Sequence, residues 1–246
     1  MTADTRVALV TGSSRGIGAG IVRALAADGI RCVVNYVADP EGRNRADAES
    51  LAAETGAALV CECDVADHAA VGAMMRSIVE AVGGLDIVVA NAGILRDRTL
   101  RKMTADDFRQ VIDVNLGGTF NVVQHATTLL RPGGRIVTIG SVAGFQGFFG
   151  QGNYAASKAG IVALTKVAAR EFARQGTTVN CVAPGFIATE ILADMPADVT
   201  EKFRASIPLG RLGAVDDVVN AVTFLCSPRS GYVTGQVIHV NGGFAM

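Results

Sequence analysis

One stretch near the N-terminus decides the fold: Val7-Ala8-Leu9-Val10-Thr11-Gly12-Ser13-Ser14-Arg15-Gly16-Ile17-Gly18. Four apolar residues predict a short buried strand, and three glycines follow it where a helix is expected to begin. Glycine lets the backbone turn tightly and come close to a ligand, while the free N–H groups at a helix N-terminus favour an anion. The stretch therefore predicts a strand, an anion-binding turn and a helix in succession.

Similar apolar runs recur along the chain and alternate with longer segments of helical periodicity. Seven strands are expected, at residues 6–11, 31–36, 57–63, 85–90, 134–140, 177–182 and 236–240. Helices are expected at residues 16–28, 43–55, 67–82, 104–130, 152–175 and 214–226. Each helical segment is long enough to connect parallel neighbours. The pattern predicts an α/β fold, a Rossmann-like doubly wound parallel sheet of about seven strands with helices on both faces.

Composition narrows the class of protein. Half of the 246 residues are apolar, 18% are charged, and no linker-like segment interrupts them, so we expect a single domain over residues 1–246. The net charge of −1 provides no general field for nucleic acid or an anionic membrane surface. No apolar run approaches the roughly 20 residues that span a bilayer, and no signal-peptide pattern precedes the first strand. A cytoplasmic location is the default expectation.

Cysteines and histidines show no metal-site pattern. The cysteines form an odd set without CxxC and lie mostly in or beside strand-like runs, so we expect reduced, buried thiols at Cys32, Cys61, Cys63, Cys181 and Cys226. Cys61 and Cys63 have no partner pair, and the histidines are too scattered for a ligand cluster: His68, His125 and His239. The sequence therefore predicts no metal.

The spacing of the first loop, TGxxxGxG, resembles the cofactor fingerprint of the classical short-chain dehydrogenase/reductase family. Three further motifs extend this resemblance in the family's order: Cys63-Asp64-Val65, Asn91-Ala92-Gly93, and Pro184-Gly185 with Ile187 and Thr189. In the family they contact the adenine, border its ribose, and hold the nicotinamide carboxamide. The resemblance implies that the dinucleotide is bound by Gly12, Ser14, Arg15, Gly16, Ile17, Gly18, Asn35, Tyr36, Asp64, Val65, Asn91, Ala92, Gly93, Tyr154, Lys158, Pro184, Gly185, Ile187 and Thr189.

Charge near the second strand selects the cofactor. An NAD enzyme needs a carboxylate at the end of that strand to accept from the ribose 2′-hydroxyl, whereas a 2′-phosphate needs cations. No acid follows the strand before Asp39. Arg15 lies inside the glycine loop, where the resemblance implies contact with a 2′-phosphate, and Arg43 or Arg45 could assist. We predict NADPH, with a solvated surface position as the alternative for Arg15.

A second constellation follows the fifth strand. Ser141 lies thirteen positions before Tyr154, and Tyr154 and Lys158 lie one turn apart on one helix face. A nearby ammonium eases deprotonation of a phenol, whose reference pKa is about 10. The S-x12-Y-x3-K arrangement resembles the family's catalytic set, and Asn115 matches its fourth member. The resemblance implies that Tyr154 donates a proton, Ser141 positions the carbonyl, Lys158 binds the nicotinamide ribose, and Asn115 holds a water.

Purely structural roles are the alternative for Tyr154, Lys158 and Asn115. A partly buried tyrosine and a snorkelling lysine on an amphipathic helix would produce the same pair as Tyr154 and Lys158. A buried hydrogen bond would explain Asn115. Ser141 is not a hydrolase nucleophile, because its surroundings lack the GxSxG elbow.

Two segments bear on the substrate. Residues 150–160 and the ending at 239–243 resemble 3-oxoacyl-[acyl-carrier-protein] reductases, with acetoacetyl-CoA reductases as close relatives. The resemblance implies NADPH-dependent reduction of a β-ketoacyl thioester in fatty-acid or polyketide synthesis. Reduction of another ketone, such as a quinone or sugar ketone, is one alternative, and a catalytically inactive NADPH-binding sensor is another.

Loops without strong periodicity at 91–103 and 184–212 follow expected strand ends, so substrate contacts are expected there. Phe145, Phe148 and Phe149 cluster between Ser141 and Tyr154. They either line an apolar substrate mouth or anchor loops and subunits.

Partners are suggested by arginines and by helix faces. The turn at residues 130–135 is short, and Arg131, Arg170 and Arg174 are either contacts for an acidic carrier protein or solvated side chains. The expected helices at 104–130 and 152–175 are apolar around much of their circumference, more than one sheet face needs to cover. We predict a homotetramer.

Overall fold

The computed structural model describes residues 5–188 and 197–246. Within these residues, seven strands form one all-parallel sheet in the order β3-β2-β1-β4-β5-β6-β7, which confirms the predicted fold class. The strands are β1 (Val7–Val10), β2 (Arg31–Tyr36), β3 (Leu59–Glu62), β4 (Leu85–Ala90), β5 (Leu130–Ile139), β6 (Thr178–Pro184) and β7 (Val237–Val240).

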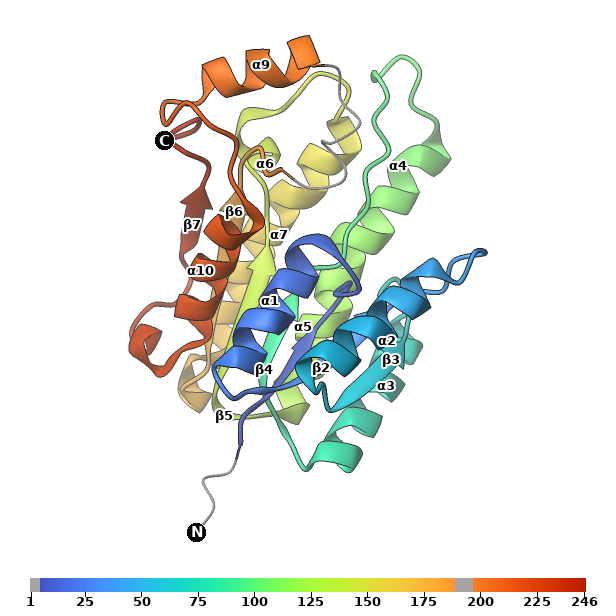
Figure 1. The fold of residues 1–246 in the computed structure, drawn as a ribbon, viewed down its shortest axis with the longest axis vertical. Coiled ribbons are helices and arrows are strands. Elements are labelled where there is room, and N and C mark those ends of the chain that lie inside the picture. Colours follow the sequence, from blue (N-terminus) through green and yellow to red (C-terminus); the bar gives the residue numbers. More distant parts are fainter. Residues whose placement is uncertain (1–4, 189–196) are drawn as a thin grey trace.

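The strand order reverses between β1 and β4, which lie side by side in the middle of the sheet. Because all strands are parallel, their C-terminal ends meet at one edge, which lies toward the top of Figure 1. Ligands of open α/β sheets bind in the crevice outside this edge, at the point of reversal. The segments that follow β1, β4, β5 and β6 therefore share one ligand-binding region.

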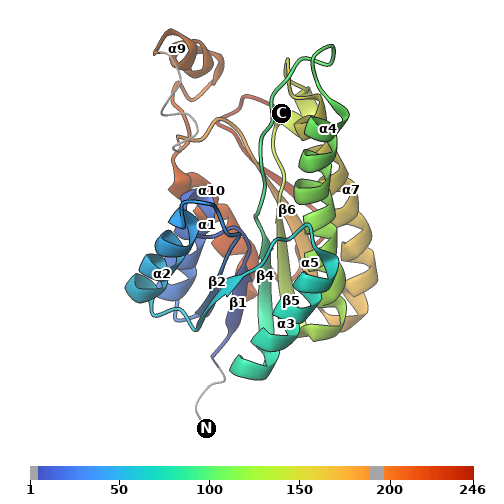
Figure 2. The same cartoon turned by 90° about the vertical axis from the view of Figure 1, so that its right-hand side faces the viewer.

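Helices cover both faces of the sheet. Figure 2 shows α1, α2 and α10 on one face and α3, α4, α5 and α7 on the other. The helices are α1 (Gly16–Ala27), α2 (Arg43–Thr55), α3 (His68–Val82), α4 (Ala105–Val111), α5 (Gly118–Leu129), α6 (Ala143–Gln146), α7 (Gly152–Phe172), α9 (Ala197–Ser206) and α10 (Val215–Cys226). Shorter turns are the π-helix η1 (Ile112–Gly117) and the 3-10 helices η2 (Ala173–Gln175) and η3 (Pro228–Ser230).

Each face of the sheet has its own apolar core. Helix residues such as Ile21, Leu25 and Val222 pack on one face, while Met75 and Ile78 pack on the other. The central strands are buried on both faces, and for this reason they read as continuous apolar runs rather than as alternating ones.

Three features of the secondary structure differ most from the sequence-based expectation. The single helix expected at 104–130 is interrupted by the π-helical turn η1, and β5 begins at Leu130 because Leu130 pairs with Leu85 across a register shift. The loop expected at 184–212 contains helix α9, whose ADVTEKFRAS sequence is too polar to produce a clear apolar stripe.

The cysteines are all free, as expected, although Cys61 is only half-buried. Burial raises the pKa of the Cys32 thiol to about 12, so this thiol stays protonated at neutral pH. Among the residues described, no group of three or more His, Cys, Asp or Glu side chains could hold a metal ion. None of the helices in the described residues is both long enough and apolar enough to cross a membrane.

Candidate active site

The loop between β1 and α1 has the geometry of an anion cradle. Gly12 adopts φ +59°, and a Cβ atom there would lie 2.8 Å from the Ala92 Cα, so only glycine fits. Gly16 also has φ +59° but faces open space. The Arg15 side chain makes no cap bond to α1. First-turn N–H groups of a helix lack intrahelical partners, so those of α1 can bind a phosphate.

Three polar side chains hold this cradle in place, two of them buried and that of Asn91 half-buried. Asn35 accepts a hydrogen bond from the Gly12 N–H at 3.0 Å and donates to the carbonyls of Cys61 and Cys63. Asn91 donates to the carbonyls of Thr11 and Gly12 at 2.9 and 3.0 Å. The Thr11 hydroxyl accepts from the backbone N–H groups of Asn91 and Ala92. Asn35 and Asn91 thus shape the site through the protein backbone.

The predicted adenine end of the site lies at the C-terminal ends of β2 and β3. The Arg15 guanidinium lies 3.8 Å from the Asp47 carboxylate, and both side chains are about half exposed. Asp39, the first acid after β2, accepts from the backbone N–H groups of Arg43 and Asn44 at the start of α2, and these bonds lower its pKa.

Two neighbouring side chains at this end have their own partners. The Arg45 guanidinium is paired with Glu49, and the Tyr36 hydroxyl donates to Glu62. Asp64 is exposed and accepts from the Ala66 N–H, whereas Val65 is buried and its carbonyl accepts from Asn121. Among the described residues, Arg15 forms a single ion pair, the long one to Asp47, and its charge also acts on Asp39.

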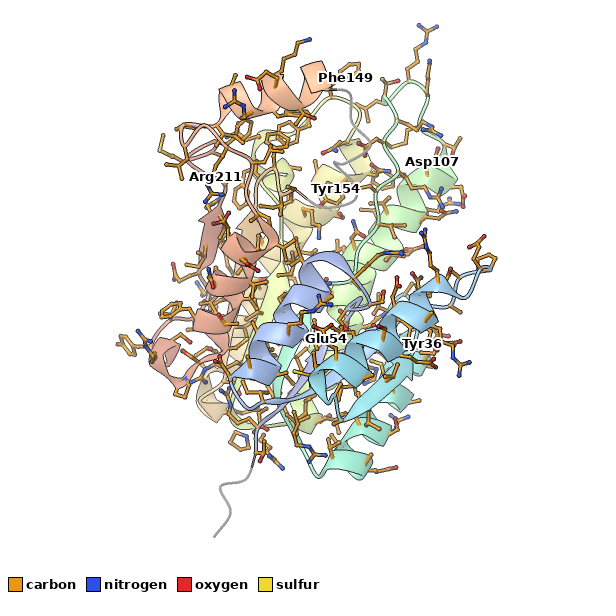
Figure 3. The ribbon with its side chains drawn as sticks, in the orientation of Figure 1. Tyr36, Glu54, Asp107, Phe149, Tyr154 and Arg211 are labelled. Atoms are coloured by element: carbon orange, nitrogen blue, oxygen red, sulfur yellow. The ribbon has the colours of Figure 1, made fainter. Side chains whose placement is uncertain are left out.

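Tyr154, Ser141 and Lys158 come together at the C-terminal edge. Tyr154 lies in the first turn of α7 (Figure 3), and its hydroxyl lies near the side chain of Ser141, which follows β5 and acts to lower the pKa of the phenol. The Lys158 ammonium lies 5.5 Å from the centre of the Tyr154 ring and donates to the Ile139 carbonyl at 2.8 Å. The end of one strand, β5, and one helix, α7, thus bring a hydroxyl, a phenol and an ammonium to one place.

Burial controls the protonation of this group. Burial raises the pKa of Tyr154, and the effect of the Ser141 side chain only partly offsets it. Burial also lowers the pKa of Lys158 to about 8. The raised pKa keeps the Tyr154 phenol neutral at neutral pH. A neutral phenol is a proton donor, and that is the form a reduction requires.

Asn115 lies in the π-helical turn and is fully buried. Its amide accepts from the Ile94 N–H at 2.8 Å and donates to the Ile94 carbonyl and to the Ser157 hydroxyl. A Cβ atom on Gly93 would lie 3.3 Å from the Asn115 Oδ1 and 3.7 Å from the Lys158 Nζ. Asn115 therefore adjoins Lys158, but its side chain is already occupied by protein partners.

Sequence reasoning missed two residues that position Tyr154. Asn153 is fully buried and donates to the carbonyls of Arg96 and Asp107, both at 3.0 Å, while its Oδ1 accepts from the Tyr154 N–H at 2.8 Å. The Ser157 hydroxyl donates to the Tyr154 carbonyl at 2.7 Å. Their partners lie up to 57 residues away along the chain. The available signal in the sequence was therefore a polar residue one position before Tyr154 and another three positions after it.

The predicted nicotinamide segment lies beside the end of β6. The Pro184 carbonyl accepts from the Val142 N–H, next to Ser141, and the Gly185 N–H donates to the Val240 carbonyl. Ile187 is buried and forms a bridge with Gly213. Thr189 lies outside the described residues.

The three clustered phenylalanines have different surroundings. The Phe148 ring lies 5.6 Å from Phe186 and 5.9 Å from Phe244, so Phe148 joins the α6–α7 loop to the segment after β6 and to the C-terminus. Phe145 packs against His239, and Phe149 is 93% exposed. These contacts favour loop anchoring for Phe148 and Phe145, while Phe149 has its ring in solvent.

The arginines that could contact a carrier protein lie at the opposite end of the sheet from Tyr154. Arg131, near the start of β5, pairs with Asp86 at 3.2 Å and donates to the Gly83 carbonyl. Arg170 and Arg174 lie at the end of α7, whereas Tyr154 lies at its beginning. These three side chains therefore lie away from the Tyr154 site of the same chain.

The family follows from a comparison of the whole chain. A family model described as enoyl-(acyl carrier protein) reductase matches residues 12–245. The chain belongs to the short-chain dehydrogenase/reductase family and is an oxidoreductase. Membership implies a nicotinamide cofactor, and the glycine cradle, with its open left-handed turn and uncapped helix, fits the phosphates of such a dinucleotide.

Particular relatives share one name. The chain is 44% identical over 244 residues to the 3-oxoacyl-[acyl-carrier-protein] reductase of Staphylococcus aureus (strain Mu50 / ATCC 700699), covering 98% of this chain and 99% of the relative. It is 42% identical to the enzyme of that name from Aquifex aeolicus (strain VF5), covering 97% of this chain and 96% of the relative. It is also 42% identical to the one from Synechocystis sp., with full coverage of both chains.

Proposed function

We propose that this protein reduces a 3-oxoacyl thioester carried on an acyl carrier protein to the 3-hydroxyacyl thioester, with NADPH as reductant. The observation that carries the proposal is the convergence of the Tyr154 phenol, the Ser141 side chain and the buried Lys158 ammonium at the C-terminal edge of the sheet. Two neighbouring hydroxyls can both donate to a ketone oxygen. The printed names of the relatives support the same substrate and a role in fatty-acid synthesis.

The proposed mechanism assigns one step to each side chain. Ser141 donates a hydrogen bond to the ketone oxygen and fixes its angle, while Tyr154 delivers its proton to that oxygen. The bound cofactor supplies a hydride to the carbonyl carbon. Lys158 holds the nicotinamide ribose and favours return of a proton to Tyr154. Asn115 acts by fixing the backbone at Ile94 and the hydroxyl of Ser157, since its amide has no free donor for a water.

The test is Tyr154→Phe. Removal of the proton donor is expected to lower kcat for an acetoacetyl thioester by about 10² to 10⁴, the usual contribution of general acid catalysis. NADPH binding, measured by its fluorescence, should remain, because the phenyl ring and Lys158 are retained. Near-full activity in the variant would refute the assignment.

Cofactor choice rests on Arg15. Its guanidinium is half-exposed and held only by the 3.8 Å contact to Asp47, so it is available for a 2′-phosphate, while Asp39 is engaged at the start of α2. We expect kcat/KM for NADPH to exceed that for NADH by at least tenfold, and Arg15→Ala to reduce this ratio while leaving the value for NADH nearly unchanged. Equal efficiency of the wild-type protein with both cofactors would contradict the proposal.

Turnover of a panel of substrates distinguishes the proposed reaction from its alternatives. The family description names an enoyl substrate, and acetoacetyl-CoA, a quinone and a sugar ketone are chemically possible substrates. A ketone is favoured, because the neighbouring hydroxyls of Ser141 and Tyr154 can both donate to its oxygen. Selective turnover of an enoyl thioester would favour the family description, and NADPH binding without turnover of any member would indicate a sensor. A role in polyketide synthesis would appear as a preference for longer or branched acyl chains.

A further inference from the structure

A basic segment lies at the C-terminal edge of the sheet, close to the catalytic helix. Residues 95–103, called here the basic arm, carry the exposed cations Arg96, Arg98, Arg101 and Lys102. The only carboxylate in the arm, Asp97, accepts a hydrogen bond from Gln151. The whole chain has a net charge of −1, so this concentration of positive charge is local.

Within the described residues the cations of the arm have few partners, and the Arg98 guanidinium donates only to the neighbouring Asp97 carbonyl at 3.0 Å. None of the three arginines forms an ion pair within residues 5–188 and 197–246 as described. Arg96 and Arg98 face the Asp107 carboxylate from the neighbouring helix α4, but that carboxylate is engaged in the capping box with Thr104. Nearby, Leu100 is 80% exposed. Uncompensated cations beside an exposed apolar side chain are typical of a surface that binds a charged partner.

The arm is nevertheless fixed in position. The Arg98 N–H donates to the Gly150 carbonyl at 2.8 Å, and the Arg96 carbonyl accepts from the buried Asn153. Leu100 packs closely on Gly152, where a Cβ atom would lie 2.8 Å from the leucine Cδ2. Asn153 also binds the Tyr154 N–H, so a single side chain connects the arm to the catalytic tyrosine.

We propose that the basic arm is the docking surface for the acidic face of an acyl carrier protein, and that it delivers the thioester to Tyr154. This inference rests on the proposed function. The partner must bring an acyl group on a long phosphodiester-linked arm, and carboxylates around the attachment point of that arm complement the four cations. The arginines at residues 131, 170 and 174 lie at the opposite end of the sheet, away from the Tyr154 site of the same chain.

The charge-reversal variant Arg98→Glu/Arg101→Glu/Lys102→Glu tests the arm. Its matched control is Arg76→Glu/Arg170→Glu/Arg174→Glu, three exposed arginines outside the arm. The readout is kcat/KM for the acetoacetyl-carrier protein divided by kcat/KM for the acetoacetyl N-acetylcysteamine thioester, which has neither phosphate nor carrier. We expect the ratio to fall at least tenfold in the arm variant, through KM, and less than twofold in the control. The salt dependence of carrier turnover should weaken in the arm variant alone.

Several outcomes would overturn the inference. A fall in the ratio in the control but not in the arm variant would place docking at the other end of the molecule. An equal loss with acetoacetyl-CoA would show that the arm binds the phosphate shared by both substrates and not the carrier protein. A change in oligomeric state of the arm variant by light scattering would make the arm a subunit contact.

A binding measurement separates this inference from the proposed function. Anisotropy of a fluorescently labelled carrier protein reports docking whether or not the thioester is reduced. Tight binding that the arm variant loses, without turnover of any 3-oxoacyl thioester, would support docking and refute the proposed function. Turnover of the carrier substrate with equal binding to both variants would support the function and refute the arm.

Discussion

The Lys158 side chain is nearly fully buried, and its ammonium has one described hydrogen-bond partner, the Ile139 carbonyl. Its pKa of about 8, below the ordinary 10.5, shows that the fold holds this charge at a cost. At a pH below 8 the lysine is charged in both the folded and unfolded chains, so the native state carries the full penalty.

Lys158→Met is therefore expected to lose activity and to gain stability. A shift of this size corresponds to about 3 kcal/mol, and loss of the bond to Ile139 returns about 1 kcal/mol, so the free energy of unfolding at pH 7 should rise by about 2 kcal/mol. Thermal unfolding of the two proteins measures this difference. A less stable variant would show that Lys158 contributes net stability to the fold.

The stability that Lys158→Met gains over the wild-type protein should decrease as the pH rises above about 8. Between about 8 and 10.5, native Lys158 has lost its proton while the unfolded chain retains it, so unfolding takes up a proton. The stability of the wild-type protein then rises with pH through this window, and the advantage of Lys158→Met should shrink toward pH 10. An advantage that stays constant from pH 7 to pH 10 would exclude Lys158 as its source.

The residues of the candidate site were predictable to the extent that they lie close in sequence. Tyr154 and Lys158 are one helical turn apart, and Ser141 follows a strand that ends beside them. Asn153 bonds backbone carbonyls of distant segments, and Ser157 connects the Tyr154 carbonyl to the distant Asn115 side chain; no local pattern encodes either arrangement. The protonation state of Tyr154 was also beyond reach, because it depends on burial.

At the scale of elements, the site depends on the close approach of α6 and α7. A Cβ atom on Gly144 of α6 would lie 2.8 Å from the Ala159 N and 2.9 Å from the Lys158 carbonyl carbon. These are backbone atoms of α7, so the clash cannot be relieved by a side-chain rotation.

Gly144→Ala is expected to displace α7 at Lys158, costing about 1–3 kcal/mol in stability and lowering kcat. Gly117→Ala is the control, since its nearest atom would be the Ile112 carbonyl oxygen at an ordinary 3.6 Å. It should be neutral or stabilising, as alanine favours a helix by up to about 1 kcal/mol. Thermal unfolding and steady-state rates are measured for both variants. Equal stabilities would show that α6 can move away from α7 at little cost in free energy.

The inner strands were predictable because burial on both faces leaves uninterrupted apolar runs bounded by turns. The edge strands β3 and β7 are less buried, but their short runs are also mostly apolar. The π-helical turn at Asn115 was not, because it depends on bonds from Asn115 to Ile94 and Ser157, which lie in other segments. Helix α9 was missed because its sequence lacks an apolar stripe.

At the scale of the whole molecule, the helices that cover one face of the sheet expose apolar side chains to solvent. Phe108 of α4 and Phe120 of α5 are 41% and 43% exposed, and Val167 of α7 is 52% exposed. Exposed apolar groups on neighbouring helices are typical of subunit contacts.

We therefore predict a homotetramer that uses this face. Light scattering at micromolar concentration should give four times the mass of the chain, and Phe120→Asp should shift the population to smaller species. Val37→Asp, on a residue with 48% exposure after β2, is the control and should leave the mass unchanged. A wild-type monomer would contradict the prediction.

The way in which the basic arm is fastened has an evolutionary consequence. The bonds to Asn153 and Gly150 use the main-chain carbonyl of Arg96 and the main-chain N–H of Arg98. Any residue other than proline at position 98 supplies the same N–H, and any residue at position 96 supplies the same carbonyl. Mutation can thus rewrite the outward side chains without moving the arm, so descendants of this scaffold can exchange one delivery partner for another while keeping the chemistry intact.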